Sequence, residues 1–471
     1  MDNAREKLTR RSFLQTTAGA AAGAAMVGSA LGSAAGEAPV AAEEVKEKGP
    51  LDDDRPFKLG IIGCGSQAVF NLMPSALRIK GIEFTAVCDI IPRRAEQAQK
   101  LAGGKAKVFD DYKDLLKNAD MDAVMIVTPL HLHRPMVEEA LANKRHVFCE
   151  KTMAYSIEDC KAMLKASIAA GRKLQIGHHL RYHPLYEFAK RHYIDAGLLG
   201  KVNNIHCQWN RNGTWKKRPE PGDEKVDFKK WGYEQLDHVV NWRLYKKYSG
   251  GLMTELASHQ LDVVNWFLDA VPEAVVGVGK IDNKDGRTIF DNVHLIYEYP
   301  DEVQVTYESI TTNSFNPFGL QAYEMFQGIK GTLVMAHLSN YVGLFFLEPG
   351  AAEKDWMPLA HKTKFPNENV PFKQHREAIV LNGTPSPGSR TEKVAGIDIV
   401  DVVDIKAARM REGFTTYQIE LMEFRTAVLD GNRPTCDGIV GLRSAIPALL
   451  GNEAMESEKK VKVTEDMYSL T

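Results

Sequence analysis

Few cysteines occur in this chain, and their positions argue against a disulfide framework and a cysteine-based metal site. Only six of the 471 residues are cysteine, at positions 64, 88, 149, 160, 207 and 436, and they show no paired metal-binding spacing. Cys64, Cys88 and Cys149 lie in or beside apolar runs. We therefore expect small buried thiols in the core rather than disulfides.

The chain also lacks an excess of charge of either sign. Its net charge is −2, so nothing favours binding to nucleic acid or to an anionic membrane surface. Hydrophobic residues make up 44% and charged residues 25%, as in an ordinary soluble globular protein. The length suits two large domains preceded by a leader.

No long run of large apolar side chains is present near the N-terminus. The Ala/Gly-rich run there ends at about Leu31 and is short and poor in large apolar side chains for a membrane span. Two interpretations of this segment are a cleaved export signal and an ordinary basic N-terminus before a membrane helix. Thr9-Arg10-Arg11-Ser12-Phe13-Leu14 resembles a twin-arginine export signal, and Ser33-Ala34-Ala35 offers small residues for cleavage. We expect a signal peptide at 1–35, a disordered polar linker at 36–55 and a bacterial periplasmic or otherwise exported mature protein without a membrane span.

A glycine turn directly follows a short apolar run. Leu59–Ile62 precedes Gly63-x-Gly65-x-x-Ala68, which is the dinucleotide-binding fingerprint. The first glycine permits the tight turn, the second lets the backbone approach a pyrophosphate, and the small third residue lets the next helix pack closely. Glycine turns also arise for conformational reasons alone, so the surrounding sequence has to decide.

Asp89 supplies that context. It ends a second apolar run, Phe84–Cys88, about 24 residues beyond the second glycine, where a ribose-binding acid is expected. Its alternative role is to cap the helix that starts near Pro92, and one carboxylate can do both. Arg93 and Arg94 follow closely and could accept a 2′-phosphate. We favour NAD and leave NADP open.

Strands and helices alternate up to about residue 178, which predicts an α/β fold with a doubly wound parallel sheet. Beyond His178 several β-rich segments follow without helices between them, which predicts a mostly antiparallel, open-faced sheet with helices on one face. We expect a Rossmann domain at 56–178 and a C-terminal substrate-binding α+β domain at 179–471. A loop rich in Lys, Arg, Pro and Trp runs from Arg211 to about Lys230.

Two groups of residues suit hydride-transfer chemistry. Lys151 follows the predicted fifth strand, where its ammonium could stabilise a substrate alkoxide; a surface lysine is the alternative. Glu255 and His259 are four residues apart on a predicted helix and so share one face. A histidine is a natural base for a hydroxyl proton, and the alternative is a surface pair or a core histidine.

Three further histidines, His178, His179 and His183, follow the last predicted strand of the first sheet. A metal site is one interpretation, but their spacing matches no zinc motif and no cysteine accompanies them. We prefer hydrogen-bonding groups around a polyol and predict no metal.

Together these motifs resemble the glucose–fructose oxidoreductase, inositol dehydrogenase and MocA (Gfo/Idh/MocA) superfamily. The resemblance extends from about Phe57 to Val463. The motifs are Gly63-x-Gly65, Cys88-Asp89, Thr128-Pro129 with His133, His146-Val147-x-x-Glu150-Lys151, and Gly250-Gly251 through His259 and Asp262.

The resemblance implies roles for individual residues. Lys151 and His259 are expected to be catalytic with Glu255, which replaces the family's Asp, while Thr152 replaces the proline that usually follows the lysine. The expected cofactor-binding residues are Gly63, Gly65, Ser66, Gln67, Asp89, Arg94, Thr128, Pro129, His133, Glu150 and Lys151. The expected substrate-binding residues are His178, Arg181, Tyr182, Arg243, Glu255 and His259. A homo-oligomer joined through the C-terminal sheet is also expected.

Three functions remain open from the sequence. The first is hydride transfer between tightly held NAD(P) and a hydroxyl of a sugar or cyclitol; the partner would be a small carbohydrate. The second is a redox-neutral, NAD-dependent glycosidase or lyase reaction through transient oxidation at C3. The third is a non-catalytic sugar-binding protein, against which the presence of Lys151 and His259 argues.

Overall fold

The computed structural model describes residues 54–314, 321–337, 342–348, 361–363, 378–380 and 414–470. The expected signal peptide and nearly all of the expected linker lie outside the described residues. Within the described part of the chain, no helix combines the length and the apolar composition that a membrane span needs.

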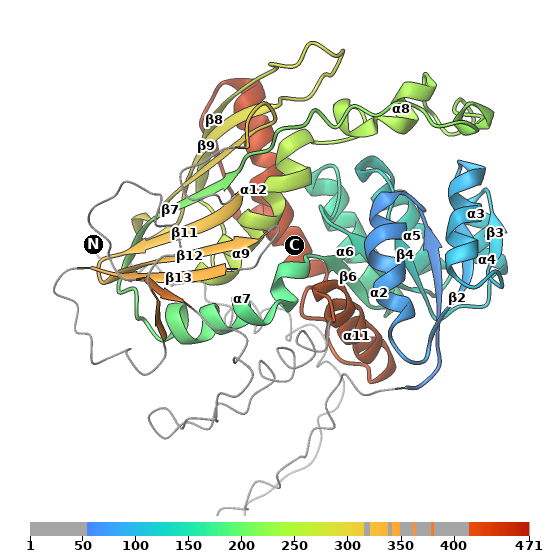
Figure 1. Ribbon diagram of the computed structural model, residues 1–471, viewed down its shortest axis with the longest axis horizontal. Coiled ribbons are helices and arrows are strands. Elements are labelled where there is room, and N and C mark those ends of the chain that lie inside the picture. Colours follow the sequence, from blue (N-terminus) through green and yellow to red (C-terminus); the bar gives the residue numbers. More distant parts are fainter. Residues whose placement is uncertain are drawn as a thin grey trace, which may run out of the picture. The chain divides into compact units, whose positions relative to one another are not determined.

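The first sheet has six strands, all parallel, in the order β3-β2-β1-β4-β5-β6 (Figure 1). Its central strands are apolar on both faces, because helices cover both sides of a doubly wound sheet. The predicted parallel sheet is confirmed. The strands are β1 Phe57–Ile62, β2 Ile82–Cys88, β3 Lys107–Phe109, β4 Ala123–Ile126, β5 His146–Glu150 and β6 Leu174–Gly177.

Local sequence signals set where the covering helices begin. Asp111 accepts a hydrogen bond from the backbone N–H of Lys113 at the start of one helix, and Ser156 accepts one from the backbone N–H of Asp159 at the start of another. The helices of this part are η1 Ala68–Leu72, α2 Met73–Leu77, α3 Pro92–Leu101, α4 Tyr112–Asn118, η2 Leu130–Leu132, α5 His133–Ala142 and α6 Ile157–Ala170.

The second sheet has ten strands in the order β14-β15-β13-β12-β11-β7-β10-β9-β8-β16. Among these described strands, every neighbouring pair is antiparallel except β7 and β10, so the predicted mostly antiparallel sheet is confirmed. The strands are β7 Val202–Trp209, β8 Ala274–Lys280, β9 Asn292–Glu298, β10 Gln304–Ile310, β11 Ala322–Gly328, β12 Gly331–His337, β13 Val342–Leu347, β14 His361–Thr363, β15 Ala378–Val380 and β16 Val461–Lys462.

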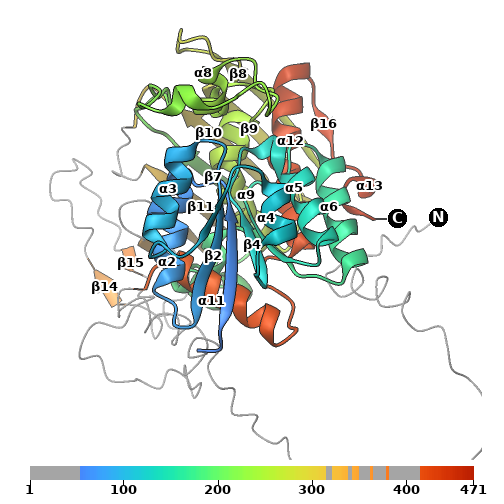
Figure 2. The same cartoon turned by 90° about the vertical axis from the view of Figure 1, so that its right-hand side faces the viewer.

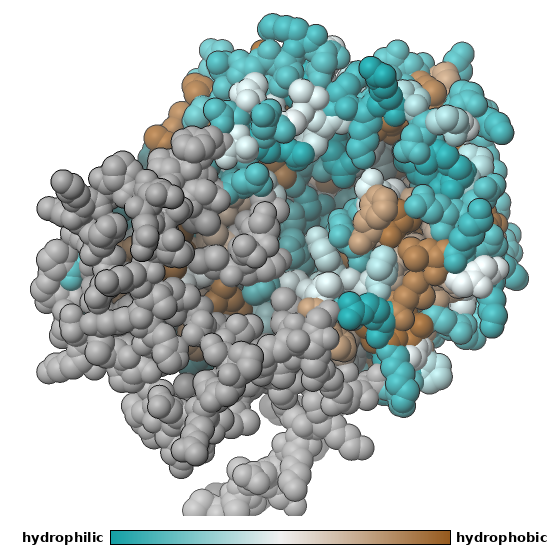
Figure 3. All heavy atoms as spheres, in the orientation of Figure 1, coloured by the Kyte–Doolittle hydropathy of each residue, from teal (hydrophilic) through white to brown (hydrophobic). Residues whose placement is uncertain are grey.

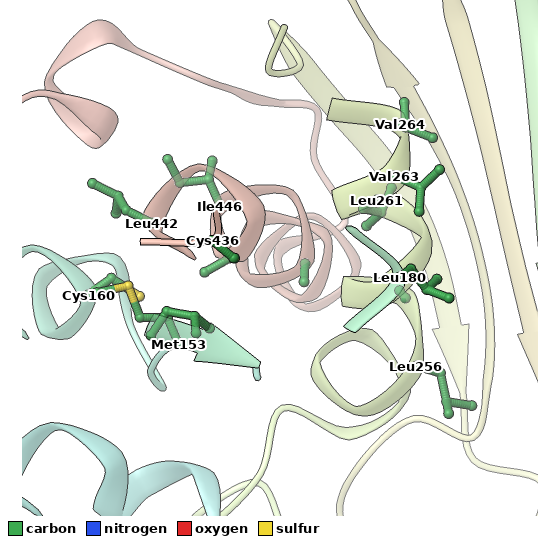
Figure 4. Close-up of a cluster of buried hydrophobic side chains, with 14 of the residues drawn as sticks. Met153, Cys160, Leu180, Leu256, Leu261, Val263, Val264, Cys436, Leu442 and Ile446 are labelled. Atoms are coloured by element: carbon green, nitrogen blue, oxygen red, sulfur yellow. The ribbon is translucent and has the colours of Figure 1, made fainter. Parts of the chain in front are cut away.

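Helices of the second part of the chain, which begins at residue 179, connect the two sheets. The long helix α12 packs against α6 of the first part and against α9 and β8 of the second. Figure 4 shows Met153 and Cys160 on one side of α12, and Leu261 and Val264 of α9 on the other. The remaining helices are η3 His179–Tyr182, α7 Pro184–Ala189, η4 Lys190–Asp195, η5 Asp223–Lys225, α8 Leu236–Val240, η6 Trp242–Leu244, η7 Met253–Ala257, α9 Ser258–Leu268, η8 Pro300–Glu302, α11 Thr416–Leu429, α12 Gly438–Ser457 and α13 Glu465–Tyr468.

The six cysteines are buried free thiols, which confirms the expectation for Cys64, Cys88 and Cys149. All six cysteine side chains are buried in the packed interior. Burial raises the pKa of the Cys64 and Cys149 thiols, so they stay protonated and inert.

The helix α11 brings the C-terminal part of the chain back onto the first sheet. Its Phe424 packs edge-on against Phe57 of β1 and Phe148 of β5, with ring centroids 6.3 and 5.9 Å apart. Its buried Arg425 donates hydrogen bonds to the backbone carbonyls of Lys80 and Arg55. The core of the first part is therefore completed by residues more than 200 positions beyond the expected domain boundary.

We expect Phe424→Ala to destabilise the protein by about 3–5 kcal/mol, because it deletes a ring that is 1% exposed and leaves a cavity against two other rings. Chemical denaturation followed by fluorescence measures the loss. Ile168→Ala removes apolar atoms from a side chain of α6 that is 60% exposed and should change the unfolding free energy by less than about 0.5 kcal/mol. Equal effects of the two substitutions would contradict this role of α11.

Candidate active site

The glycine turn has the backbone that its sequence predicts. Gly63 follows β1 with φ +91°, and a Cβ atom there would lie 2.5 Å from the carbonyl oxygen of Val127. A Cβ on Gly65 would meet no atom within 4 Å, so this part of the turn faces open space. The turn then leads into the helix that contains η1. These features suit a pyrophosphate approaching the backbone and the start of a helix.

Asp89 braces this turn from the end of β2. Its carboxylate accepts hydrogen bonds from the backbone N–H groups of Cys64, at 2.7 Å, and Ile91, at 2.8 Å. Burial raises the pKa of Asp89, and the charge of Arg94 lowers it in part. The residue that caps α3 is Ile91, so Asp89 supports the turn before the helix rather than capping it directly.

A cavity of about 350 Å³ opens beside the turn. The structure brings eight of the expected cofactor-binding residues together in its wall: Gly63, Gly65, Ser66, Gln67, Asp89, Arg94, Thr128 and Pro129. The glycine backbone and the donors Ser66 and Gln67 suit a pyrophosphate, and Asp89 suits a ribose hydroxyl. The lining of this cavity therefore fits NAD.

The opposite wall of this cavity comes from the second part of the chain. Residues 211–245, which we call the strap, cross over α3 (Figure 1, green; Figure 2, above α3). The strap is fastened by an apolar cluster in which Val226, Tyr233 and Val239 pack with Ile91. Sequence analysis identified most of the strap only as a loop rich in Lys, Arg, Pro and Trp. That composition was the available signal.

Lys217 of the strap reaches the glycine turn. Its Nζ donates to Ser66 Oγ at 3.4 Å. Burial lowers the pKa of Lys217, and the nearby charges of Arg243 and Arg94 lower it further. Cations that repel one another around exposed backbone N–H groups form a natural site for an anion such as a pyrophosphate. Lys217 is therefore a candidate cofactor contact that the sequence did not reveal.

Arg93, one of the two arginines that left NADP open, is held by carboxylates of the strap. Its Nε donates to Asp223 at 2.8 Å, and its Nη1 lies 2.9 Å from Glu220. The Asp223 side chain is 1% exposed, whereas that of Glu220 is 67% exposed, so we assign most of the restraint to Asp223. Arg93 is thus less available to a 2′-phosphate.

A second cavity, of about 470 Å³, shares walls with the first, including Ser66, Thr128 and Arg243. The predicted catalytic residues Lys151, Glu255 and His259 line it together. It also contains Glu150 from the end of β5 and His133 from the start of α5. His179, one of the histidines expected around a polyol, lines it too, with Arg211, Trp215 and Tyr417, for which sequence analysis assigned no contact. In Figure 3 the outer surface over the strap is mostly hydrophilic, while apolar side chains gather over α2.

Lys151 lies at the junction of the two parts of the chain. Its Nζ donates to the backbone carbonyl of Glu255 at 2.7 Å. The Lys151–Thr152 peptide bond is cis, and Thr152 Oγ1 donates to the carbonyl of Thr254 at 2.8 Å. Burial lowers the pKa of Lys151, while the charges of Glu255 and Glu150 oppose that shift. The replacement of the family's proline by Thr152 leaves the lysine side chain in the cavity.

Glu255 lies in the π-helical turn η7, and His259 follows in α9, so the expected single α-helix begins with a wider turn. The Glu255 carboxylate accepts a hydrogen bond from Arg243 Nε at 2.7 Å and one from Ser249 Oγ at 3.3 Å. Burial acts to raise the pKa of Glu255, but the charges of Arg243 and Lys151 outweigh it and lower the pKa. Glu255 is therefore an ionised acceptor at neutral pH.

His259 is 9% exposed and lies among aromatic rings. Its ring centroid is 5.0 Å from that of His179 and 5.6 Å from that of Trp209. These neighbours hold the imidazole at the cavity wall, where a substrate hydroxyl can reach it.

His133 connects the loop that follows β4 to the loop that follows β5. Its Nε2 lies 3.0 Å from the carbonyl of Thr128, and its Nδ1 lies 3.0 Å from that of Thr152. It also lines the second cavity. We interpret it as a residue that positions the loop carrying Lys151. A second bridge runs from Gln67 Nε2 to Glu150 Oε1, at 2.8 Å, and joins the glycine turn to β5.

Three expected substrate contacts lie behind the cavity wall. Arg181 makes a two-pronged ion pair with Asp262, at 2.8–3.0 Å. Tyr182 is fully buried and its hydroxyl accepts from the backbone N–H of Cys436. His178 is 1% exposed and 3.8 Å from Asp262. None of the three is among the described residues that line either cavity. Their substrate roles stay predictions.

Two further observations limit the choice of site. Within the residues described, no three His, Cys, Asp or Glu side chains are grouped so as to hold a metal ion. A larger cavity, of about 890 Å³, lies along α6 and α12, but none of the expected site residues lines it. We therefore place the candidate active site in the two joined cavities.

Comparison with known families agrees with this arrangement. A model described as an oxidoreductase family with an NAD-binding Rossmann fold matches residues 57–178, and a Gfo/Idh/MocA C-terminal domain model matches residues 189–334. The fold and site define a NAD-binding oxidoreductase-type protein. The chain belongs to the Gfo/Idh/MocA family.

Individual relatives match over part of their length. Inositol 2-dehydrogenase of Salmonella paratyphi B is 30% identical over 221 residues, which are 44% of this chain and 63% of that protein. 2,7-Anhydro-N-acetylneuraminate hydratase of Escherichia coli is 32% identical over 165 residues, or 35% of this chain and 38% of that protein. These matches thus span less than two thirds of the curated relatives.

A solved structure is similar over nearly all of its length. Aldose–aldose oxidoreductase from Caulobacter crescentus, complexed with glycerol, superposes with a TM-score of 0.62. The match covers 87% of this chain and 100% of that one at 20% sequence identity. At this identity the likeness shows the fold alone.

Asp223→Asn should raise the affinity for NADP relative to NAD. The substitution removes the buried charge that holds Arg93, and a charge-assisted hydrogen bond is worth about 1.5–3 kcal/mol, so we expect the affinity ratio to change by about tenfold or more. Fluorescence titration of nucleotide-free protein with NADPH and NADH measures the ratio. Glu220→Gln, at an exposed position, should change it much less. An unchanged ratio in Asp223→Asn would show that Arg93 does not discriminate.

The pH dependence of catalysis should follow the charges around Lys151. The charge of Glu255 raises the pKa of Lys151 and that of Arg243 lowers it. If the protonated lysine is the active form, the alkaline limb of kcat/KM moves to lower pH in Glu255→Gln and to higher pH in Arg243→Gln. Steady-state rates across pH measure both limbs. Shifts in the same direction would exclude the protonated lysine as the group that titrates.

Proposed function

We propose that this protein is an NAD-dependent oxidoreductase that transfers hydride to or from a hydroxyl of a sugar or cyclitol and keeps its nucleotide bound between turnovers. The observation that carries the proposal is the placement of Lys151, Glu255 and His259 in a cavity that shares walls with the glycine-turn cavity. The relative named as an inositol 2-dehydrogenase supports a polyhydroxylated substrate.

Each residue has a distinct part in this chemistry. The nicotinamide, when bound, supplies the hydride acceptor or donor. His259 takes the hydroxyl proton as the alcohol is oxidised, and returns it in the reverse direction. Lys151 donates a hydrogen bond to the oxygen on which negative charge develops. Glu255 and Arg243, already paired, orient neighbouring hydroxyls.

The strap supports tight retention of the nucleotide. It supplies the second wall of the cofactor cavity, and both its apolar cluster and the buried Asp223 tie it to the first part of the chain. Release of a nucleotide would require these contacts to open. We infer that one nucleotide serves many turnovers, which suits a protein loaded in the cytoplasm and exported folded, as the twin-arginine motif suggests.

Redox-neutral chemistry is the second candidate. One relative is named as a hydratase, and the hydration of a substrate involves no net oxidation. A nucleotide that stays bound also suits a reaction in which the hydride returns to the same substrate. Oxidation at C3 acidifies the C2 proton, which allows elimination of a leaving group and addition of water before C3 is reduced again. Glu255, His259 or Lys151 would serve as acid and base. A sugar-binding protein without catalysis is the third candidate.

We also propose that subunits assemble through the exposed face of the second sheet. Val276 and Val278 of β8 and Ile296 of β9 are 41%, 69% and 45% exposed on neighbouring strands. β-Branched side chains grouped on an open sheet face suit burial against a second copy.

Purified protein should contain NAD(H). We expect denaturation to release a nucleotide with the ultraviolet spectrum and mass of NAD or NADH. His259→Ala should keep that nucleotide while losing about 10²- to 10⁴-fold in turnover, because an acid–base group is removed and the cofactor cavity is not. Absence of bound nucleotide, together with failure to take any up, would disprove the proposed function.

The same preparation distinguishes the two catalytic candidates. A net dehydrogenase produces reduced nicotinamide absorbance when substrate and NAD are added. A redox-neutral enzyme consumes glycoside without lasting absorbance change and incorporates solvent deuterium next to the oxidised carbon. If sugars, cyclitols and glycosides give neither signal, the binding-protein candidate is favoured.

A further inference from the structure

Arg211 occupies a distinct place in the second cavity. It follows β7, and its backbone N–H donates to the carbonyl of Ile310 at 2.9 Å. Its side chain lines the second cavity but not the cofactor cavity, whereas Lys217 and Arg243 line both. Arg211 is therefore the strap cation assigned to the substrate side alone.

The guanidinium of Arg211 has no hydrogen-bond or ion-pair partner among the described residues, and its Nε is buried. It lies over the ring of Trp215, with Cζ 4.7 Å from the ring centroid. Burial lowers the pKa of Arg211, and the charge of Arg243 lowers it further. A half-buried arginine without an acidic partner is costly unless a ligand supplies the missing charge.

The other cations of this cavity already have partners. Lys151 donates to the carbonyl of Glu255, Arg243 to the Glu255 carboxylate, and Lys217 to Ser66 beside the cofactor turn. Within the residues described, Arg211 is thus the lysine or arginine in the wall of this cavity whose side chain has no hydrogen-bond partner.

The segment that carries Arg211 is held in a fixed shape. Trp215 has φ +64°, a left-handed conformation that is rare for a bulky residue and is typically retained at functional sites. Arg287 donates to the carbonyl of Thr214 at 2.8 Å, and Asn241 pairs with both backbone groups of Lys217. Such restraints prepare the Arg211–Trp215 pair before a ligand arrives.

We propose that Arg211 and Trp215 form a subsite for the carboxylate of a sugar acid, so that the preferred substrate is a uronic acid or a derivative rather than a neutral sugar. This inference rests on the proposed function. With Nε buried, the two Nη groups at the end of the guanidinium are the donors that can meet a carboxylate in a two-pronged pair. The indole ring offers an apolar platform to the C–H face of the sugar ring.

Binding to the purified protein with its own nucleotide tests the subsite without requiring turnover. Isothermal titration calorimetry compares D-glucuronate, D-galacturonate and D-mannuronate with their methyl esters, which keep the size and lose the charge. We expect at least one acid to bind about 10- to 100-fold more tightly than its ester, because one charge-assisted pair is lost in the ester.

Variants assign the difference to Arg211. Arg211→Gln should remove the preference for the acid and leave binding of the ester within about threefold, whereas Arg211→Lys, which keeps the charge but not the planar fork, should keep part of it. Lys229→Gln removes a charge from an exposed position on the same strap and should leave the preference unchanged.

The proposal is overturned if no acid binds better than its ester, if Arg211→Gln weakens acid and ester equally, or if glucose 6-phosphate binds more tightly than every acid. Loss of the proposed function has a different signature: no nucleotide in the purified protein and no hydride transfer, whatever the acid preference. A protein that holds NAD but prefers esters and neutral sugars would keep the proposed function and reject the carboxylate subsite.

Discussion

The hydrogen bond from Lys151 to the backbone carbonyl of Glu255 joins the two halves of the active site. Lys151 follows the fifth strand of the nucleotide-binding sheet, and Glu255 lies in η7, the helical turn that leads into α9 of the second part. The neighbouring bond from Thr152 to Thr254 doubles this connection. A small shift between the sheets would therefore move the lysine away from Glu255, so the catalysis proposed for this site depends on how firmly the two parts are held.

Two long returns of the chain provide that firmness. The helix α11 completes the core beneath β1 and β5, and the strap closes over α3 through a buried ion pair and an apolar cluster. Each return brings functional side chains with it: Tyr417 at the start of α11 and Lys217 in the strap both line the second cavity. The same contacts that stabilise the domain arrangement therefore also form the ligand-binding walls.

The features that sequence reasoning predicted are those encoded locally. The turn at Gly63, the acid at Asp89 and the alternation of strands with helices depend on neighbours a few residues away. Arg93 and Asp223, which pair, are 130 positions apart in the sequence. Asp223 lies in a polar loop whose sequence has no hydrophobic periodicity, so nothing local predicted the pair. Arg181 illustrates the converse: the family resemblance implied a substrate contact, whereas the structure pairs its guanidinium with Asp262, a residue 81 positions away, and the substrate role stays a prediction.

The distribution of charge gives the site an order of assembly. Among the described residues, Lys151, Arg211, Lys217 and Arg243 line the second cavity with only Glu150 and Glu255 as carboxylates, so this wall carries an excess of positive charge. A bound dinucleotide brings two phosphate charges to the glycine turn beside Lys217, which relieves repulsion there. Arg211, outside the cofactor cavity, gains little from those phosphates. Its charge must be met by solvent or by the second ligand, and that ligand's own negative charge is then what completes the electrostatic balance of the closed site.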